Sequence, residues 1–247
     1  YPIAEDTRVH LPVMICQDGF ITSHAVMNME ILDDMTVKEF VGEREPVDYL
    51  LNPEEKFAVG PYAVSDYYME SRKAQAHAME NAKQVILDVA KDFEKISGRK
   101  YGLIEEYKMD DAEYAMVIIG SAAGTAKEAV DEMREAGKKV GIIKIRSFRP
   151  FPGEEIATSL KKCKAVAVMD RCESFSTNGG PVGAETMQAM YTNGCTAKAI
   201  NIMYGIGGRD VTVGDMRGVY DTLEEIAKTG ETGPTYRYMG LRDKEAK

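Results

Sequence analysis

Tryptophan, paired cysteines, an excess of basic residues and long apolar runs are all missing from this chain of 247 residues. Its four cysteines, at positions 16, 163, 172 and 195, show no CxxC spacing, so local sequence offers no zinc or iron–sulfur ligand set. The formal net charge of −9 argues against a nucleic-acid backbone as partner. No apolar run approaches the roughly 20 residues of a membrane span. We therefore predict no nucleic-acid partner, no membrane partner, no metal site and the reduced thiols of a cytoplasmic protein.

The second half of the chain alternates regularly between strand and helix patterns. An apolar run at 115–119 leads through a glycine-rich turn at 120–124 into an amphipathic helix, and a second apolar run follows at 140–145. Two buried strands joined by a helix must be parallel, with a right-handed crossover. We predict an α/β domain with an open sheet of four or five mostly parallel strands. Its other elements are helices at 153–162 and 182–191, strands at 165–169 and 197–203, and a last helix capped by Thr212 with Asp215 at its third position.

The first half is less regular and reads as an incomplete α/β unit. Residues 11–16 predict a short buried strand. Residues 31–41 carry a weak helical pattern with Thr36 as N-cap. The strongest signal is a long helix over 65–97, with Ser65 as N-cap and Gly98 after its last apolar position. One strand and one long helix cannot make a core alone.

Two glycine-rich loops leave a choice between ligand binding and plain turn geometry. A βα turn such as 120–124 is where α/β proteins often bind phosphates. However, it lacks the GxGxxG fingerprint, and Lys127 stands at the wrong offset for a P-loop. The loop 205–210 could bring backbone amides to an anion, or it could be a crowded turn in which Arg209 pairs with Asp210 or Asp215. We favour the turn in both cases.

The densest polar cluster of the first half follows the predicted strand at 11–16. Asp18, Thr22, Ser23 and His24 stand within seven residues, at the kind of position where α/β proteins form sites. His24 could carry a proton or bond a carboxylate, and the hydroxyls could bind substrate oxygens or cap the next segment. A lone histidine is more often structural. We list these four residues as candidates for a substrate cavity or a subunit interface.

Five runs, in this order, resemble one enzyme family. They are DGFITSH, VGPYAVSDYYMESRKAQAHAMENA, VIIGSAAGTAKEAVDEMREAGKKVGIIKIRSFRPFP, MDR with NGGPVGAE, and YGIGGRD. They resemble the α subunit of the thiamine-dependent 2-oxoacid:acceptor oxidoreductases, of the pyruvate:ferredoxin type. The resemblance implies that 1–64 is the C-terminal part of a pyrimidine-binding domain. It also implies a long helix and linker at 65–109, a transketolase C-terminal-like domain at 110–235 and a tail at 236–247.

In this family the reaction is the oxidative decarboxylation of pyruvate to acetyl-CoA and CO₂ with ferredoxin as acceptor, or the reverse synthesis. The resemblance implies thiamine diphosphate with Mg²⁺ and iron–sulfur clusters in the whole complex, and none bound by this chain alone. It further implies thiamine-binding and iron–sulfur partner subunits, ferredoxin, coenzyme A as a substrate, and a dimer of heteromers. Because few residues precede Asp18, the chain looks like the C-terminal part of the subunit, and no catalytic or cofactor-binding residue can be assigned. Two alternatives stay open: a structural, oligomerising module, or a free nucleotide- or coenzyme A-binding domain.

Overall fold

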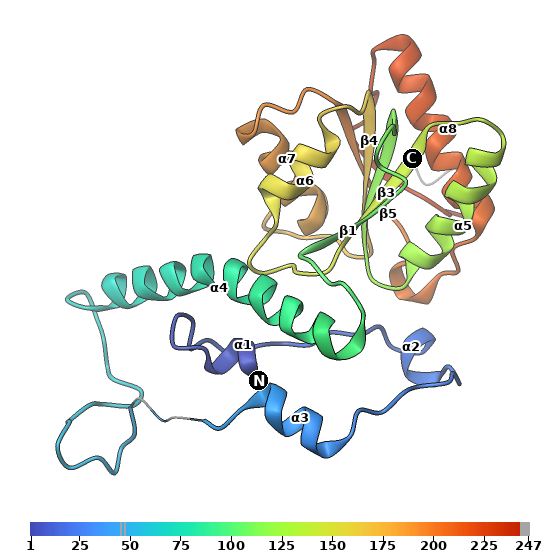
Figure 1. Cartoon of the computed structure of the whole chain (residues 1–247). Helices are drawn as coiled ribbons and strands as arrows, with labels where there is room; N and C mark the ends of the chain where they lie inside the picture. Colours follow the sequence, from blue (N-terminus) through green and yellow to red (C-terminus); the bar gives the residue numbers. More distant parts are fainter. Residues whose placement is uncertain (45, 47, 243–247) are drawn as a thin grey trace. The chain divides into compact units, whose positions relative to one another are not determined.

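The computed structural model describes residues 1–44, 46 and 48–242, and it divides the chain into two compact units (Figure 1). The first unit comprises Tyr1–Cys16 and Val26–Gly102, and the second comprises Gln17–Ala25 and Leu103–Lys247. Each unit has a core of its own. The finer division expected from the family resemblance stays a prediction.

The second unit is built on a six-stranded sheet with the order β1-β3-β2-β4-β5-β6. All neighbouring pairs are parallel except β1 with β3. The mostly parallel α/β fold predicted from the sequence is therefore confirmed. In addition to the four predicted strands, the sheet has two edge strands, β1 and β6. The strands are β1 (Ile104–Tyr107), β2 (Tyr114–Ile119), β3 (Val140–Ile145), β4 (Ala165–Asp170), β5 (Lys198–Met203) and β6 (Tyr236–Tyr238).

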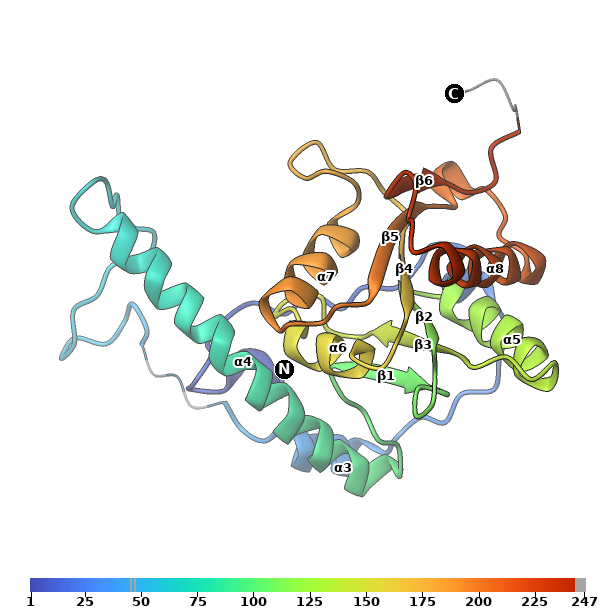
Figure 2. The same ribbon diagram turned by 90° about the horizontal axis from the view of Figure 1, so that it is seen from above.

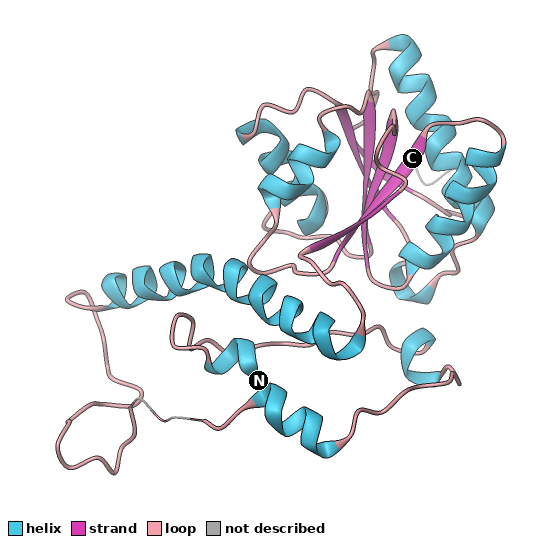
Figure 3. Ribbon diagram, in the orientation of Figure 1, coloured by secondary structure: helices cyan, strands magenta, loops and turns pink. Residues whose placement is uncertain are grey.

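Helices cover both faces of this sheet (Figures 2 and 3). Helices α5 (Ala122–Glu135) and α8 (Val213–Thr229) pack together on one face, and α6 (Gly153–Leu160) and α7 (Pro181–Thr192) pack on the other. This double covering explains why the central strands read as continuous apolar runs rather than alternating ones. The chain crosses from β2 to β3 on one side and then to β4 on the other, so the topological switch point lies between β2 and β4.

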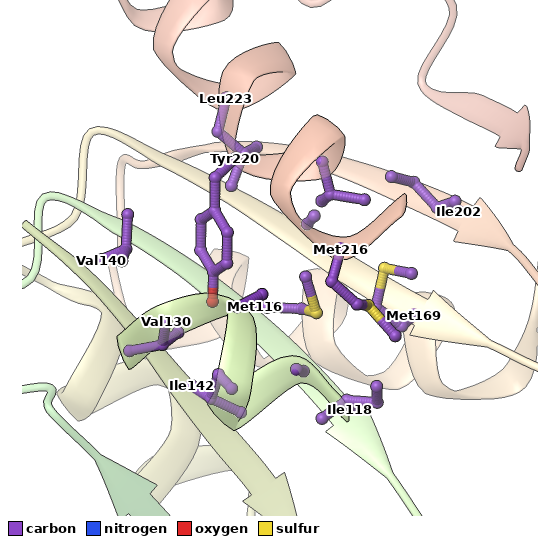
Figure 4. Close-up of a cluster of buried hydrophobic side chains, with 14 of the residues drawn as sticks. Met116, Ile118, Val130, Val140, Ile142, Met169, Ile202, Met216, Tyr220 and Leu223 are labelled. Carbon is purple, nitrogen blue, oxygen red and sulfur yellow. The ribbon is translucent and has the colours of Figure 1, made fainter. Parts of the chain in front are cut away.

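The core under α5 and α8 is dominated by large side chains that are fully buried (Figure 4). Met116 and Ile142 come from the sheet, and Leu223 comes from α8. Tyr220, also on α8, is fully buried, and its hydroxyl donates a hydrogen bond of 2.9 Å to the carbonyl oxygen of Gly141. Burial holds the pKa of Tyr220 well above its usual value, so the phenol stays a neutral donor.

The first unit consists of helices and irregular chain. Its helices are α1 (Pro2–Glu5), α3 (Asp34–Val41) and α4 (Tyr68–Ser97), while the short α2 (Ile21–His24) belongs to the second unit. Helix α4 confirms the predicted long helix, and Gly98 ends it in a left-handed conformation with its N–H bonded to Glu94. The core is small, with Val9, Ala82 and Val85 as its buried members. Among the described residues, no helix is apolar enough over a sufficient length to cross a bilayer.

The predicted strand at 11–16 is wrong, because these residues form no strand and are mostly exposed. Met14 and Ile15 are 86% and 94% exposed. A strand is stable only when neighbouring strands pair with its backbone, and the described residues of the first unit contain no other strand. The apolar run thus has strand propensity, but no neighbouring strand is present to pair with it.

Two predicted helix caps are also wrong, and one is right. Helix α3 is capped by Asp33, whose carboxylate accepts the Thr36 N–H at 3.0 Å, so Thr36 lies inside the helix. Helix α4 starts at Tyr68, after a turn that contains Ser65, and has no side-chain cap. At α8 the predicted pair is confirmed, since Thr212 and Asp215 cap each other's backbone N–H groups.

Replacing Tyr220 by Phe should lower the free energy of unfolding by about 1–2 kcal/mol, because the buried Gly141 carbonyl loses its donor from α8. The chain has no tryptophan, so unfolding by urea is best followed by circular dichroism. Tyr191→Phe is the matched control, since Tyr191 is 87% exposed. Equal midpoints for the two variants would contradict this assignment.

Candidate functional site

Three loops leave the carboxyl ends of neighbouring strands in the second unit. They follow β2 at 120–124, β4 at 171–180 and β5 at 205–210. In open α/β sheets this edge is where ligands bind, because the two faces are covered by helices. The candidate site is therefore this edge, and each loop supplies different chemistry.

The loop after β2 is a tight strand-to-helix turn. Gly120 has a φ of 84°, which favours glycine, and the Gly124 N–H bonds to the Ser121 carbonyl at 2.9 Å. Ser121 is the N-cap position of α5, yet its side chain makes no capping bond. This geometry accounts for the glycine at 120 without a phosphate.

The segment 17–25 belongs to the same unit as this turn. The Thr22 hydroxyl donates a hydrogen bond to the Asp18 carboxylate. This bond, with a smaller contribution from Ser121, holds the pKa of Asp18 below its usual value despite partial desolvation. The other carboxylate oxygen of Asp18 is buried and has no hydrogen-bond partner among the described residues.

Ser23 and His24 form a second, separate group in this segment. Ser23 Oγ accepts the Phe20 N–H at 2.8 Å and lies 2.7 Å from Nδ1 of His24. The His24 ring stacks on Phe20, with 5.2 Å between centroids. Since the Ser23 oxygen already accepts one bond, its own hydrogen is free to bond the imidazole. The hydroxyl is therefore used within α2.

The four predicted residues thus lie together as two bonded pairs, Asp18 with Thr22 and Ser23 with His24. Thr22, Ser23 and His24 are exposed, and Asp18 is half-buried. The buried strand on which the prediction rested is not formed. Their assignment to a substrate cavity or an interface stays a prediction.

The loop after β4 is fixed by a buried carboxylate. Asp170 is 1% exposed, and its two oxygens accept the N–H groups of Val182 at 3.0 Å and Gly183 at 2.8 Å. These are first-turn donors of α7, which otherwise lack partners, and the positive end of the helix dipole favours the negative charge. Asp170 therefore ties the end of β4 to the start of α7.

Asn201 on β5 completes this network. It is 3% exposed, and Nδ2 donates to Asp170 at 2.8 Å and to the Val168 carbonyl at 2.9 Å, while Oδ1 accepts the Gly180 N–H at 2.8 Å. A Cβ on Gly180 would stand 2.2 Å from the Asp170 carboxyl carbon, and one on Gly183 would stand 2.4 Å from the Asn201 amide carbon. The glycines of NGGPVGAE are thus explained by close packing on two buried polar side chains.

The sequence patterns did not predict this network, although Asp170 and the three glycines stand in runs that resemble the family. A usable signal was present: an acidic residue closes an apolar strand, and Pro181 opens a helix after two glycines. Whether Asp170 lies next to the start of this helix depends on the order of strands in the sheet. Local sequence patterns do not predict that order.

The loop after β5 contradicts the predicted pairing of Arg209. Its guanidinium donates to the Gly240 carbonyl, and within the described part of the chain it forms no ion pair with Asp210 or Asp215. Asp215 is instead used in the Thr212 capping box. The predicted turn itself is present as a short 3₁₀ segment, η1 (Ile206–Gly208). The two arginines after β3, by contrast, form ion pairs, Arg146 with Glu105 and Arg149 with Glu185.

Tyr204 lies at the base of this loop. It is 2% exposed, and burial raises its pKa to about 12, so it stays protonated. Its hydroxyl has no hydrogen-bond partner among the described residues. The nearby charges are Arg171 and Asp170.

The metal ion of a thiamine diphosphate site finds no ligand group in the described part of the chain. The helices of the first unit enclose only the small core around Val85. Across residues 1–44, 46 and 48–242, no three His, Cys, Asp or Glu side chains are grouped to hold a metal ion. We derive no chemical step through a thiamine from this chain.

Comparison with known proteins places both halves of the chain in one class. Residues 1–91 match the family described as pyruvate flavodoxin/ferredoxin oxidoreductase, thiamine diphosphate-binding. Residues 112–216 match the pyruvate:ferredoxin oxidoreductase core domain II. The class is therefore that of the 2-oxoacid oxidoreductases, and the resemblance seen in the sequence is confirmed.

Individual relatives narrow the resemblance to the α, or PorA, subunit. The chain is 42% identical over 241 residues to pyruvate synthase subunit PorA of Thermotoga maritima, covering 98% of this chain and 60% of that protein. The same subunit of Methanocaldococcus jannaschii is 41% identical, covering 91% of this chain and 57% of the relative. The α subunit of an NADH-dependent phenylglyoxylate dehydrogenase from Aromatoleum evansii is 39% identical, covering 95% and 58%. The chain thus spans about three fifths of the length of these relatives.

Among solved structures, a 2-oxoglutarate:ferredoxin oxidoreductase from Magnetococcus marinus matches with a TM-score of 0.44 and 17% identity, covering 64% of this chain and 24% of that one.

Replacing Asp170 by Asn should lower the free energy of unfolding by about 2–4 kcal/mol, because an amide turns its own donors toward the N–H groups of α7. Circular dichroism during urea unfolding measures the change. Asp221→Asn, the same substitution at an exposed position of α8, should leave the midpoint unchanged. A midpoint shift no larger than that of the control would show that the network is not stabilising.

Replacing Thr22 by Val should raise the pKa of Asp18 toward the ordinary aspartate value of 3.8, because the carboxylate loses its strongest hydrogen bond. The change is read from the carboxyl ¹³C shift during an NMR pH titration. In the native chain, the stabilisation from this bond is present above the unfolded-state pKa and fades as pH falls through the lowered one. Ser23→Ala is the control and should leave the Asp18 titration in place; an unmoved pKa in Thr22→Val would refute the assigned cause.

Proposed function

We propose that this chain is part of the α subunit of a pyruvate:ferredoxin oxidoreductase, which oxidatively decarboxylates pyruvate to acetyl-CoA and CO₂ or runs the reverse synthesis. The observation that carries this proposal is the similarity of about 40% to PorA subunits along almost the whole chain. The two family matches, which fall in the order expected for such a subunit, add to it. The alternatives of a purely structural module and of a free nucleotide- or coenzyme A-binding domain are not favoured.

Within this proposal, thiamine diphosphate, Mg²⁺ and iron–sulfur clusters are cofactors of the assembled complex, and the match of residues 1–91 to a thiamine diphosphate-binding family supports the first of them. The cofactors would supply the carbanion and electron-transfer chemistry. The partners are thiamine-binding and iron–sulfur subunits, ferredoxin and a second heteromer, in the cytoplasm. This chain would contribute the α5/α8-covered sheet and its carboxyl-edge loops as a rigid frame.

Pyruvate is proposed as the substrate, and phenylglyoxylate stands as the specific rival. Seven PorA relatives are 36–42% identical to this chain, and the phenylglyoxylate dehydrogenase subunit is 39% identical. Sequence identity therefore supports the enzyme class, the 2-oxoacid oxidoreductases, more strongly than it supports pyruvate as the particular substrate.

Isolation of the tagged chain under anoxic conditions from the cells that make it should yield a complex that reduces ferredoxin in the presence of pyruvate and coenzyme A. Phenylglyoxylate and 2-oxoglutarate are the comparison substrates, and omission of coenzyme A is the control. Recovery of the chain without partner subunits and without activity would overturn the proposed function. Preference for phenylglyoxylate would keep the class and replace the substrate.

A further inference from the structure

An open hollow of about 480 Å³ lies beside the loop that follows β5. Its lining comes from two parts of the second unit: the loop 206–210 and the segment after β6, through Gly240 and Arg242. The hollow stands at the carboxyl edge of the parallel sheet, where α/β folds bind ligands. Its size is that of a small-molecule site. None of the functions discussed above uses it.

The backbone of this loop is accessible because glycines form it. Gly205, Gly207 and Gly208 have φ angles of 61°, 68° and 80°, in the left-handed region. At Gly207 and Gly208 a Cβ would have no other atom within 4 Å, so open space adjoins the main chain there. Successive backbone N–H groups in a turn can form a concave surface that favours anions.

The charged side chains of the hollow are two arginines and one carboxylate. Arg209 is held in place by its bond to the Gly240 carbonyl, and no carboxylate in the described ranges lies within 4.0 Å of Arg209 or Arg242. Among the described residues, six other arginines pair with carboxylates, namely Arg8, Arg44, Arg134, Arg146, Arg149 and Arg217, and four do not. Arg209 and Arg242 stand out because both line the same hollow.

A third guanidinium supports the loop from its other side. Arg171 Nη2 lies 3.4 Å from the Gly205 carbonyl, and a Cβ on Gly205 would stand 3.0 Å from its Nε. Arg171 therefore adds positive charge beside the loop, and the φ of 61° favours a glycine at position 205.

From this arrangement we infer that the hollow is a binding site for a phosphate-bearing small molecule. Guanidinium groups bind phosphate oxygens with two parallel hydrogen bonds, and Arg209 and Arg242 can approach one diphosphate from the loop and from the terminal segment. Asp210 opposes the anion and keeps the excess positive charge small. The inference goes beyond the proposed function, because it concerns binding at a site to which no step of that reaction is assigned.

Titration of the full chain with inorganic diphosphate, followed by calorimetry at low ionic strength, tests the inference. Wild type should bind at one site, and Arg242→Gln should weaken binding by about tenfold, because one charge-assisted contact is lost. Arg209→Gln should do the same, and Arg209→Lys should retain only part of the affinity. Asp210→Asn, by contrast, should tighten binding, because the one lining carboxylate is neutralised. The Gly207 and Gly208 amide resonances should shift on titration.

Arg72→Gln on α4 removes the same charge at an exposed position of the first unit and is the matched control. Arg242 makes no hydrogen bond or ion pair with a described residue, so its replacement tests binding even if Arg209→Gln disturbs the loop. No saturable binding by wild type would overturn the inference, as would equal loss in Arg72→Gln. Because the readout is binding by the chain itself, a negative result here leaves the proposed function intact, and loss of the proposed function leaves the site intact.

Discussion

A parallel sheet that is covered on both faces can present polar groups only at its strand ends, and this constraint organises the second unit. The central strands β2, β3, β4 and β5 bury their side chains under two pairs of helices. Their backbone groups are satisfied by neighbouring strands, so the interior has little need for polar side chains. The chemistry-bearing residues accordingly gather in the loops that leave the carboxyl ends.

Two of the buried polar residues, Asp170 and Asn201, show how the edge is held. Both are buried, and both are tolerated because their polar groups are engaged by helix α7, by the loop before it and by each other. The carboxylate faces the positive end of a helix dipole, which lowers the cost of burying its charge. At Gly179, Gly180 and Gly183 a Cβ would clash with Asp170 or Asn201. The buried network therefore requires glycine at these three positions.

The sequence was sufficient for the parts whose stability is local or periodic. The strands at 115–119 and 140–145, the long helix ending at Gly98 and the capping box at Thr212 all depend on residues near one another in the chain. The edge strands β1 and β6 were missed because they are only four and three residues long and half polar. The strand at 11–16 was wrong for the converse reason, since propensity without a pairing partner makes no strand. The Asp170 network escaped prediction because strand order, which brings β4 and β5 side by side, is a property of the whole fold.

The two units differ in how much apolar surface they bury, and therefore in how far burial can stabilise each of them. The second unit buries two continuous clusters on either side of its sheet. Among its described residues, the first unit has a buried cluster of three, Val9 with Ala82 and Val85 of the 30-residue helix α4. Fixing the backbone costs about 1–2 kcal/mol per residue, and full burial of an aliphatic side chain returns about 1.5–3 kcal/mol. A core this small cannot offset the ordering of the remaining chain, and exposed Met14 and Ile15 add unburied apolar surface. A segment with this balance needs other polypeptide to fold against, which supports the proposal that the chain acts as part of a larger subunit within a complex.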